Sequence, residues 1–302
     1  MITLTSHDVG QVSLRSFMLE FRPAIERALL HNMPVSPPQI QRSFGEAMHK
    51  ALFSGGKRIR PALTMLGAEL VGGSTLNVLA AATAVEYIHT SSLIFDDLPC
   101  MDNASERRGK PALHVQYGEG LAVLVALALL NKAYVLVIEK ADCEFNRALQ
   151  SHMDLTRCIE AQIFGQVLDI ASDTSPASQQ EHEGLHSLRN LKASALVGLS
   201  VKLGAIISGA SQDRLDVLTK FAELLGDAYQ ISDDINDQVE DKELLGEPRH
   251  TTFPARYGEE SAKYRVAELT SEAKKTLISE FGPTAPAAIL CEIADYVAAR
   301  CG

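Results

Sequence analysis

The chain has no tryptophan, and aromatic residues make up only 6% of its 302 positions. It also has few runs of alternating polarity and few clusters of β-branched residues, which are the patterns of half-buried strands. Apolar residues instead recur every three or four positions through almost the whole chain. This spacing predicts an all-α protein, and 46% hydrophobic residues suffice for a large core.

No low-complexity linker and no repeat of fixed period interrupts the chain, so we expect a single domain over residues 1–302. Clusters rich in Gly, Pro and Ser at 34–38, 72–74 and 173–176 separate the helical segments. The predicted helices cover residues 14–32, 38–53, 58–72, 76–101, 112–140, 146–171, 180–209, 211–238, 259–281 and 284–299.

Positive charge is scarce, because 28 Lys and Arg residues stand against 38 Asp and Glu residues and give a formal net charge of −10. An acidic protein does not attract phosphate backbones by its overall field, so we expect no nucleic-acid partner. Any anionic substrate must therefore be held by local basic groups or by metal ions.

Cysteine is also sparse. The five cysteines are odd in number and scattered, without the paired spacing of a zinc site or a disulfide framework. Residues 1–10 lack the basic and apolar regions of a signal peptide, and the final Cys301-Gly302 is not a prenylation signal. We therefore expect a protein of the reducing cytoplasm.

One long apolar stretch, residues 121–138, is interrupted only by Asn131, Lys132 and Tyr134. A membrane-spanning helix needs about 20 apolar residues and tolerates a central lysine poorly. We therefore interpret the stretch as a helix buried inside a helical bundle, and expect no stable membrane insertion.

Two aspartate clusters far apart in the sequence are the strongest signal in the chain. The first comprises Asp96, Asp97 and Asp102, and the second Asp233, Asp234 and Asp237. Adjacent carboxylates repel one another, and each cluster follows an apolar segment, so a solvated acidic helix end is a weak explanation for the two together. Oxygen ligands without nearby His or Cys predict Mg²⁺ or Ca²⁺ rather than zinc.

The two clusters differ in spacing. Helix geometry places positions i, i+1 and i+4 within about 100° of arc, so the aspartates of the second cluster can aim at one volume. In the first cluster, two extra residues would turn Asp102 to another side of a straight helix. Pro99 disturbs the helical hydrogen bonds, and we predict a bulge there that returns Asp102 to the side of Asp96.

Basic residues complete the pattern. The segment Gly55-Gly56-Lys57-Arg58-Ile59-Arg60-Pro61 places three cations between a flexible loop and a helix start, whose free N–H groups also attract anions. The segment Arg107-Arg108-Gly109-Lys110 closely follows the first aspartate cluster. Arginine forks bind diphosphate oxygens in pairs, and lysine adds a compact charge. A solvated charge run is the alternative, but cations and metal sites around one cavity predict a site for two diphosphates.

His89 precedes Asp96 by two helical turns on the same face. A lone histidine on an apolar helix is more often a core residue than a ligand, but this position favours a ligand role. Gln166 and Asp169 also lie about one helical turn apart. They either line a cavity or join two helices by a hydrogen bond.

Taken in order, the segments GGKRIRP, AVEYIHTSSLIFDDLPCMDNASERRGKP, GQVLD and GDAYQISDDIND resemble the all-trans short-chain isoprenyl diphosphate synthases. This polyprenyl synthetase family includes the farnesyl and geranylgeranyl diphosphate synthases, and the resemblance spans about residues 40–260. The longer first motif is similar to that of the bacterial and plant enzymes. The resemblance implies the isoprenoid synthase fold, which is all-α around a deep central cavity, and a homodimer.

The family activity implied is head-to-tail condensation of isopentenyl diphosphate with a dimethylallyl, geranyl or farnesyl diphosphate, with three Mg²⁺ per active site. By position in the motifs, the metal ligands would be Asp96 and Asp102 with Asp97 in support, and Asp233 with Asp234 and Asp237 in support. Isopentenyl diphosphate would be held by Lys57, Arg60, His89 and Arg108, and the allylic substrate by Arg107, Lys192 and Gln230. The residues expected to act in catalysis are Asp96, Asp97, Asp102, Lys192 and Asp233.

Breaking the allylic C–O bond leaves a carbocation and pyrophosphate, so cations must stabilise the leaving group while an apolar cavity excludes water. The departing pyrophosphate is expected to take the final proton, so no Ser/His/Asp arrangement is needed. Ser91 and Ser92, shortly before Asp96, are predicted to set the cavity floor. A bulky aromatic at the position of Ser91 tends to stop growth at farnesyl diphosphate in this family. Serine therefore favours geranylgeranyl diphosphate, with farnesyl diphosphate as the alternative product.

Other functions remain as alternatives. A class I terpene cyclase would need an Asn/Ser/Glu second metal motif and more aromatic residues than this chain has. A non-catalytic subunit that modulates another synthase would not need intact aspartates in both clusters. The chain departs from the usual family pattern at Ala104-Ser105, Leu127, Ala193 and His250, none of which is a predicted metal ligand.

Overall fold

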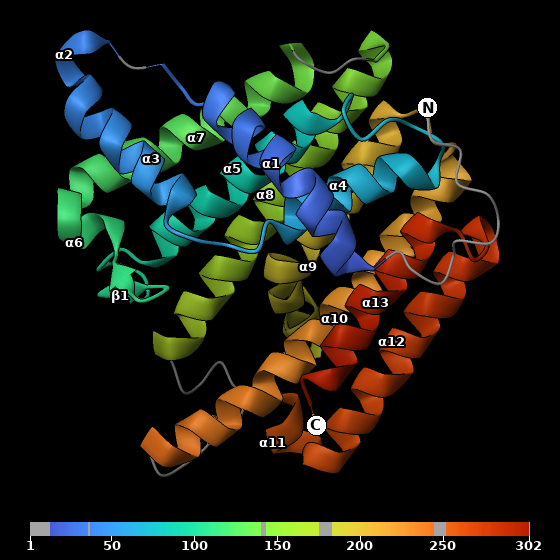
Figure 1. Cartoon of the computed structure of the whole chain (residues 1–302). Helices are drawn as coiled ribbons and strands as arrows, with labels where there is room; N and C mark the ends of the chain where they lie inside the picture. The colour runs from blue at the N-terminus through green and yellow to red at the C-terminus, as the bar shows by residue number, and fades with distance from the viewer. Residues whose placement is uncertain (1–12, 36, 140–142, 175–182, 245–251, 302) are drawn as a thin grey trace. The chain divides into compact units, whose positions relative to one another are not determined.

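The computed structural model describes residues 13–35, 37–139, 143–174, 183–244 and 252–301; within them, the side chains of 40–41, 169, 171–174, 183–193 and 237–244 are not described. Over these ranges the regular secondary structure is helical apart from one small hairpin, with short loops between the helices (Figure 1). The elements are α1 (Leu14–His31), α2 (Pro38–Ile40), the π-helix η1 (Gln41–Gly45), α3 (Glu46–Phe53), α4 (Ile59–Leu70), α5 (Leu79–Asp96), β1 (Glu106–Arg107), β2 (Lys110–Pro111), α6 (Leu113–Tyr117), α7 (Glu119–Glu139), α8 (Phe145–Thr174), α9 (Glu183–Ile207), α10 (Gln212–Leu244), α11 (Phe253–Tyr257), α12 (Glu259–Phe281) and α13 (Ala285–Ala299).

The predicted all-α class is confirmed, and the helix boundaries differ where local backbone chemistry intervenes. The predicted helix 112–140 is divided at Gly118, whose φ of 83° ends α6. A positive φ strains most residues but not glycine. The predicted helix 76–101 ends already at Asp96, and α10 continues beyond the predicted residue 238. The short helix α11 was missed because five residues carry too little periodicity.

The contacts within the chain define two compact units. Unit 1 comprises residues 1–18, 157–202 and 210–302, and unit 2 comprises residues 19–156 and 203–209. The first aspartate cluster and the basic segments belong to unit 2, whereas the second aspartate cluster belongs to unit 1. The expected single domain over 1–302 stays a prediction.

In unit 2, α5 packs against α4 and α7. Its side chains from Ala81 to Ile88 are all buried, which explains why the helix shows little polar face. The end of α9 crosses α4 so closely that a Cβ on Gly204 would lie 1.8 Å from the carbonyl oxygen of Thr64. Only glycine permits this contact. The tight core holds in place α4 and α5, which carry Arg60 and His89.

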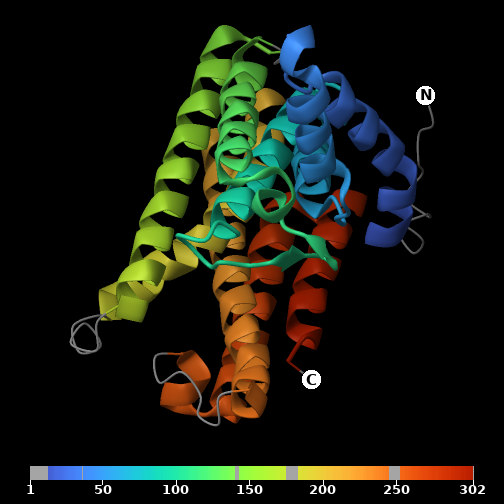
Figure 2. The ribbon, with the colours of Figure 1, turned by 90° about the vertical axis from the view of Figure 1, so that its left-hand side faces the viewer.

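In unit 1, α10 packs along α12 and α13, and Figure 2 shows these orange and red helices running side by side. Phe221, Ala228 and Val266 are among the side chains buried in this unit. A Cβ on Gly226 of α10 would lie 2.0 Å from the Cβ of Ser194 on α9, so these two helices also need glycine at their crossing. The packing fixes the part of α10 that carries the second aspartate cluster.

Helix α7 is long and apolar enough to cross a membrane by length and composition, as a core helix of a globular protein also can be. Its residues Ala122, Val125 and Leu129 are fully buried, whereas Leu124 and Leu127 are about half exposed. The prediction of a buried helix is therefore right for one face of α7 and wrong for the opposite face.

Candidate active site

A cationic cavity in unit 2 gathers residues from three parts of the sequence. It has a volume of about 530 Å³ and is lined by Gly56, Lys57, Arg58, Ile59, Arg60, Glu86, His89 and Arg108. These residues come from the loop before α4 and the start of α4, the middle of α5, and the turn of the hairpin β1–β2. All four residues predicted to hold isopentenyl diphosphate lie on this one wall, so the structure brings them together.

Arg58 has a different position from the other two cations of its segment. It is buried and adopts a left-handed backbone with φ of 55°, and its guanidinium donates to Glu86 Oε1 at 2.7 Å, Glu26 Oε1 at 3.0 Å and the Leu52 carbonyl oxygen at 2.6 Å. Burial by itself would lower the pKa of Arg58, but the bonds to Glu26 and Glu86 outweigh it and raise the pKa. The expectation that all three cations attract anions therefore needs correcting, since this one anchors the loop internally.

His89 is electrically neutral in this setting. Burial, together with the nearby positive charges of Arg60, Arg108, Arg107 and Arg58, lowers its pKa to about 2. Its Nε2 lies 3.3 Å from Nη1 of Arg60, and because a guanidinium can only donate, Nε2 is the acceptor and Nδ1 carries the proton. His89 thus orients Arg60 without adding a charge to the cavity.

The hairpin delivers Arg108 to the cavity. Arg107 pairs with Lys110, and the two-residue turn between them, Arg108-Gly109, has positive φ at both positions, as in type I′ turns. Arg108 Nη1 donates to the Gly55 carbonyl oxygen at 2.7 Å. Across the described chain, the only non-glycine residues with positive φ are Arg58, Asn103 and Arg108; Arg58 and Arg108 line this cavity, and Asn103 directly follows the first aspartate cluster. Such strain, about 1–3 kcal/mol each, is typical of functional sites.

The first aspartate cluster lies where α5 ends. The backbone N–H of Asp102 donates to the Asp96 carbonyl oxygen at 2.9 Å, and Asn103 N–H donates to Leu98 at 3.1 Å. The predicted return of Asp102 toward Asp96 is therefore seen in the backbone. It arises from a helix end and a tight turn rather than from the expected bulge in a continuing helix, because Pro99 follows just beyond the last helical residue.

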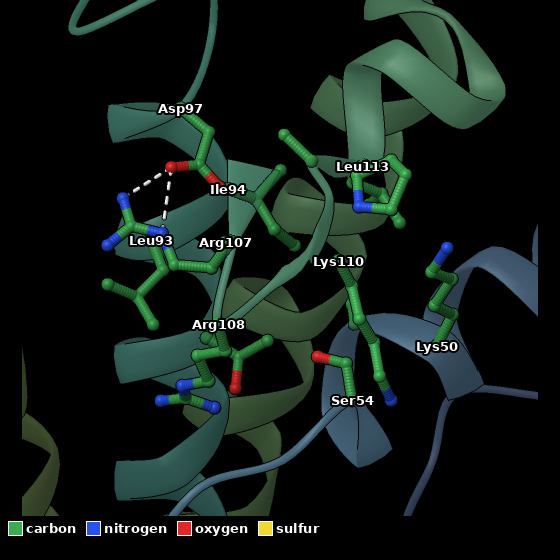
Figure 3. Close-up of a pocket in the computed structure, with 13 residues that line it drawn as sticks. Lys50, Ser54, Leu93, Ile94, Asp97, Arg107, Arg108, Lys110 and Leu113 are labelled. Atoms are coloured by element: carbon green, nitrogen blue, oxygen red, sulfur yellow. Dashed lines mark hydrogen bonds and ion pairs between the residues drawn. The ribbon is translucent and has the colours of Figure 1, made fainter. Parts of the chain in front are cut away.

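Asp97 turns to the hairpin. Its buried carboxylate accepts hydrogen bonds from both Nε, at 2.9 Å, and Nη2 of Arg107 (Figure 3). The bond to Asp97 raises the pKa of Arg107, so the guanidinium is charged at any working pH. The pair borders a second, small cavity of about 50 Å³, with Lys50 and Ser54 among its lining residues.

The second aspartate cluster lies on α10 in unit 1. Asp233 forms an ion pair with Arg300, which follows α13. Burial raises the pKa of Asp233, while Arg300 acts in the opposite direction. Asp234 accepts hydrogen bonds from Gln230 Nε2 at 3.1 Å and from the Phe253 N–H at 3.4 Å. Gln230, predicted to face the allylic substrate, is thus engaged with a predicted metal ligand.

Several predicted site residues lie outside the described structure. The side chains of Asp237 and Lys192 are not described, although their backbones lie on α10 and α9. The same holds for Asp169, the predicted partner of Gln166, and for Ala193, while His250 lies outside the described ranges altogether. Their roles stay predictions.

The carboxylates fit Mg²⁺ by their chemistry. Among the side chains that can be placed, no three acidic, His or Cys groups converge on a single point. Mg²⁺ in proteins is usually held by one or two carboxylates together with water and substrate phosphates rather than by a complete protein cage. Asp96 with Asp102 in unit 2, and Asp233 in unit 1, are oxygen donors of this kind.

Ser91 and Ser92, the predicted cavity floor, differ in their surroundings. The Ser91 hydroxyl is buried and lies 2.9 Å from two carbonyl oxygens, that of Tyr87 in its own helix and that of Ala126 in α7. The Ser92 hydroxyl donates to the His89 carbonyl oxygen at 2.9 Å and is half-buried. Ser91 therefore lies at the contact between α5 and α7.

Sequence reasoning missed Arg300 and the acceptors of Arg58. Arg300 gives no local signal, because it is an ordinary basic residue after a helix and lies far from Asp233 in the sequence. Glu86 lies on the buried helix α5 close to His89, and a buried glutamate is rarely left without a cation. That signal was present in the sequence but was not used.

Comparison with known proteins identifies the family. The family model described as "Polyprenyl synthetase" matches residues 41–255. The chain therefore belongs to the polyprenyl synthetase family of trans-prenyltransferases, as its motifs predicted.

Individual relatives agree. The chain is 38% identical to the chloroplastic geranylgeranyl pyrophosphate synthase of Capsicum annuum over 95% of this chain and 79% of the relative. It is 33% identical to the mitochondrial geranylgeranyl pyrophosphate synthase 10 of Arabidopsis thaliana over 98% and 88%. An apo FPP/GFPP synthase structure from Zymomonas mobilis superposes with a TM-score of 0.83 at 31% identity, covering 94% of this chain and 98% of that one.

Proposed function

We propose that this trans-prenyltransferase condenses isopentenyl diphosphate with an allylic diphosphate, head to tail, and that geranylgeranyl diphosphate is its main product. The observation that carries the proposal is the cavity of about 530 Å³ around Lys57, Arg60, His89 and Arg108. Three cations and a neutral histidine converge there, and the diphosphate of isopentenyl diphosphate has the charge to match them.

The residues around the cavity in unit 2 have different roles in binding isopentenyl diphosphate. Arg58 and its buried acceptors hold the loop, so that Lys57 and Arg60 meet the substrate without reordering. Arg108 donates to Gly55 and joins the hairpin to the same loop. His89 stays neutral and directs Arg60. Preorganised charges of this kind bind the diphosphate of isopentenyl diphosphate at little reorganisation cost.

We assign ionisation of the allylic substrate to the two aspartate clusters and the metal ions that they would hold. Bound Mg²⁺, three ions by family analogy, would neutralise charge that grows on the departing pyrophosphate. Asp96 and Asp102 would hold Mg²⁺ in unit 2. Asp233, with Asp234 and Asp237 in support, would hold Mg²⁺ in unit 1. We assign Arg107, Lys192 and Gln230 to binding of the allylic diphosphate. The departing pyrophosphate is proposed to accept the proton that is lost after condensation.

Product length rests on the helix before Asp96. Ser91 and Ser92 are small, and relatives named geranylgeranyl pyrophosphate synthase support the longer product. Ser91→Tyr is expected to shift the main product to farnesyl diphosphate, with Ser91→Ala, which keeps the side chain small, as the matched control. Because Ser91 is packed against Ala126, the larger ring also costs about 1–3 kcal/mol of stability. An unchanged product from a folded Ser91→Tyr enzyme would place the floor elsewhere.

A second copy of the chain is the proposed partner. Leu124 and Leu127 of α7 and Phe145, Leu149 and Met153 of α8 are exposed on unit 2. The rings of Tyr134 on α7 and His152 on α8 make a tilted contact between these two helices, with centroids 5.5 Å apart. An exposed apolar surface of this kind is typical of a subunit interface. Leu149→Glu is expected to yield monomers in sedimentation experiments.

The five cysteines are all free thiols. A compartment that keeps thiols reduced, the cytoplasm, is therefore proposed as the location. Localisation of a tagged chain by microscopy tests it.

One assay tests the reaction and its alternatives. Purified protein is incubated with Mg²⁺, isopentenyl diphosphate and each allylic starter, and product length and released pyrophosphate are measured. A synthase yields geranylgeranyl diphosphate and pyrophosphate only when both substrates are present. A terpene cyclase would release pyrophosphate from the allylic substrate alone, and a non-catalytic subunit would release none.

A further inference from the structure

The ion pair between Arg300 and Asp233 occupies a carboxylate that the proposed function needs for metal. Arg300 Nη2 donates to Asp233 Oδ1, and the guanidinium carbon lies 4.4 Å from the centroid of the Tyr229 ring. The side chains of Arg300 and Asp233 are 22% and 33% exposed. The guanidinium is therefore held by a charge on one side and an aromatic face on the other, at a site that solvent and ligands can reach.

A guanidinium and a divalent cation compete for the same oxygen. Both are positive, so they repel each other at contact distance, and the lone pairs of Oδ1 that accept from Arg300 are those a metal would use. The neighbouring Asp234 accepts hydrogen bonds from the Gln230 amide and the Phe253 N–H.

We propose that Arg300 is the counter-ion of Asp233 in the absence of ligands. When a divalent cation and a diphosphate bind, Asp233 releases Arg300. This arginine therefore sets the metal affinity of the second aspartate cluster. The inference rests on the proposed function. Tyr229 keeps the released guanidinium nearby, so the pair re-forms once the ligands leave. In the absence of ligands, Arg300 neutralises the charge of the half-buried Asp233 carboxylate, which would otherwise be costly to bury.

The effect on affinity should be modest. Partly exposed ion pairs are weak, and converting their usual strength into an equilibrium constant gives a factor of about two to five. A pair of this strength can be displaced by a divalent ion and still re-form.

The chain offers a matched control in the same unit. Arg214 donates to Glu280 Oε1 at 3.2 Å, and its guanidinium carbon lies 5.7 Å from the centroid of the Phe281 ring. It thus repeats the combination of arginine, carboxylate and aromatic ring away from the aspartate cluster. Any general effect of removing one positive charge would appear equally in Arg214→Gln.

The test measures binding of Mn²⁺ in the presence of inorganic pyrophosphate by electron paramagnetic resonance. Arg300→Gln should bind Mn²⁺ about two to five times more tightly than the unsubstituted protein. Arg300→Lys, which keeps the charge, and Arg214→Gln should bind as the unsubstituted protein does. Equal affinity in Arg300→Gln, or an equal gain in Arg214→Gln, overturns the inference.

A second measurement follows the release itself. Cys301 adjoins Arg300 and is only 8% exposed. Addition of Mn²⁺ and pyrophosphate should accelerate alkylation of Cys301, measured by mass spectrometry of its chymotryptic peptide, and Asp233→Asn should abolish that acceleration. An unchanged alkylation rate despite bound Mn²⁺ overturns the release. If the unsubstituted protein takes up no Mn²⁺ at all, the metal mechanism of the proposed function fails as well, so the two failures are distinguishable.

Discussion

The two aspartate clusters, both predicted to bind metal, are built in different ways. The first is built at a helix end, where a tight turn returns Asp102 to the backbone of Asp96. The second lies within the continuous helix α10, where the helical period alone sets the spacing. A turn can be reshaped by its neighbours, whereas a helical face is fixed by its own hydrogen bonds.

In each cluster a carboxylate is paired with an arginine, and the two arginines come from different parts of the chain. Asp97 is paired with Arg107 from the adjacent hairpin, and Asp233 with Arg300 from beyond α13. The first pair joins segments close in sequence and orders the hairpin that carries Arg108. The pair of Arg300 and Asp233 joins segments far apart in the sequence, and α10 continues through Asp233 without a break. We infer that the first pair is architectural and the second exchangeable.

The largest expected effect comes from removing one metal ligand of each cluster. Asp96→Ala and Asp233→Ala should each lower kcat/KM by roughly 1000-fold, because a metal contributes several kcal/mol of transition-state stabilisation. Steady-state assays with Mg²⁺ and both substrates measure this, with thermal unfolding as a check on folding. A loss in only one variant would mean that the two clusters are not equivalent, and near-normal turnover in both would remove the metal mechanism.

The next largest effect distinguishes Arg58, which is bonded inside the protein, from Lys57, which faces the cavity. Arg58→Met should lower the free energy of unfolding by about 3 kcal/mol, because Glu86 is left buried without its partner. Lys57→Met, on an exposed residue of the same loop, should change stability by less than about 1 kcal/mol but raise KM for isopentenyl diphosphate. Urea unfolding and initial-rate measurements test the two variants. Equal stability losses would contradict the internal role of Arg58.

The architectural role of Asp97 can be tested by a double-mutant cycle. Asp97→Asn and Arg107→Gln should each raise KM for the allylic diphosphate by about tenfold, since a hydrogen bond to a charged group contributes about 1.5–3 kcal/mol. If the pair acts as one unit, the double variant should be no worse than either single one. Additive losses would instead mean that Asp97 acts independently of Arg107, as a metal ligand would.

The helical period predicted most of the helices, and short motifs indicated both aspartate clusters and four of the residues that line the cationic cavity. Helical period and short motifs encode these features within a few residues. The pairing of Arg300 with Asp233, the anchoring of Arg58 and the contact of Ser91 with Ala126 depend on which helices pack together. No local pattern encodes such packing. The helix end at Asp96 shows the same limit, because Pro99 signals a disturbance without specifying a bulge or a turn.

The smallest effect concerns the pH dependence of unit 2. Burial and the surrounding arginines lower the pKa of His89 to about 2, whereas the unfolded chain has the ordinary value of about 6.5. Below that value the unfolded state binds one more proton than the folded state, so stability is full above about pH 6.5 and falls as the pH drops. Between pH 8 and pH 5.5 this single group should lower the free energy of unfolding by about 1.4 kcal/mol. His89→Gln should remove that part of the slope in urea unfolding, while His31→Gln, on an exposed residue, should leave it unchanged. An identical slope in His89→Gln would mean that His89 is protonated in the folded protein, and the cavity would then hold one more positive charge.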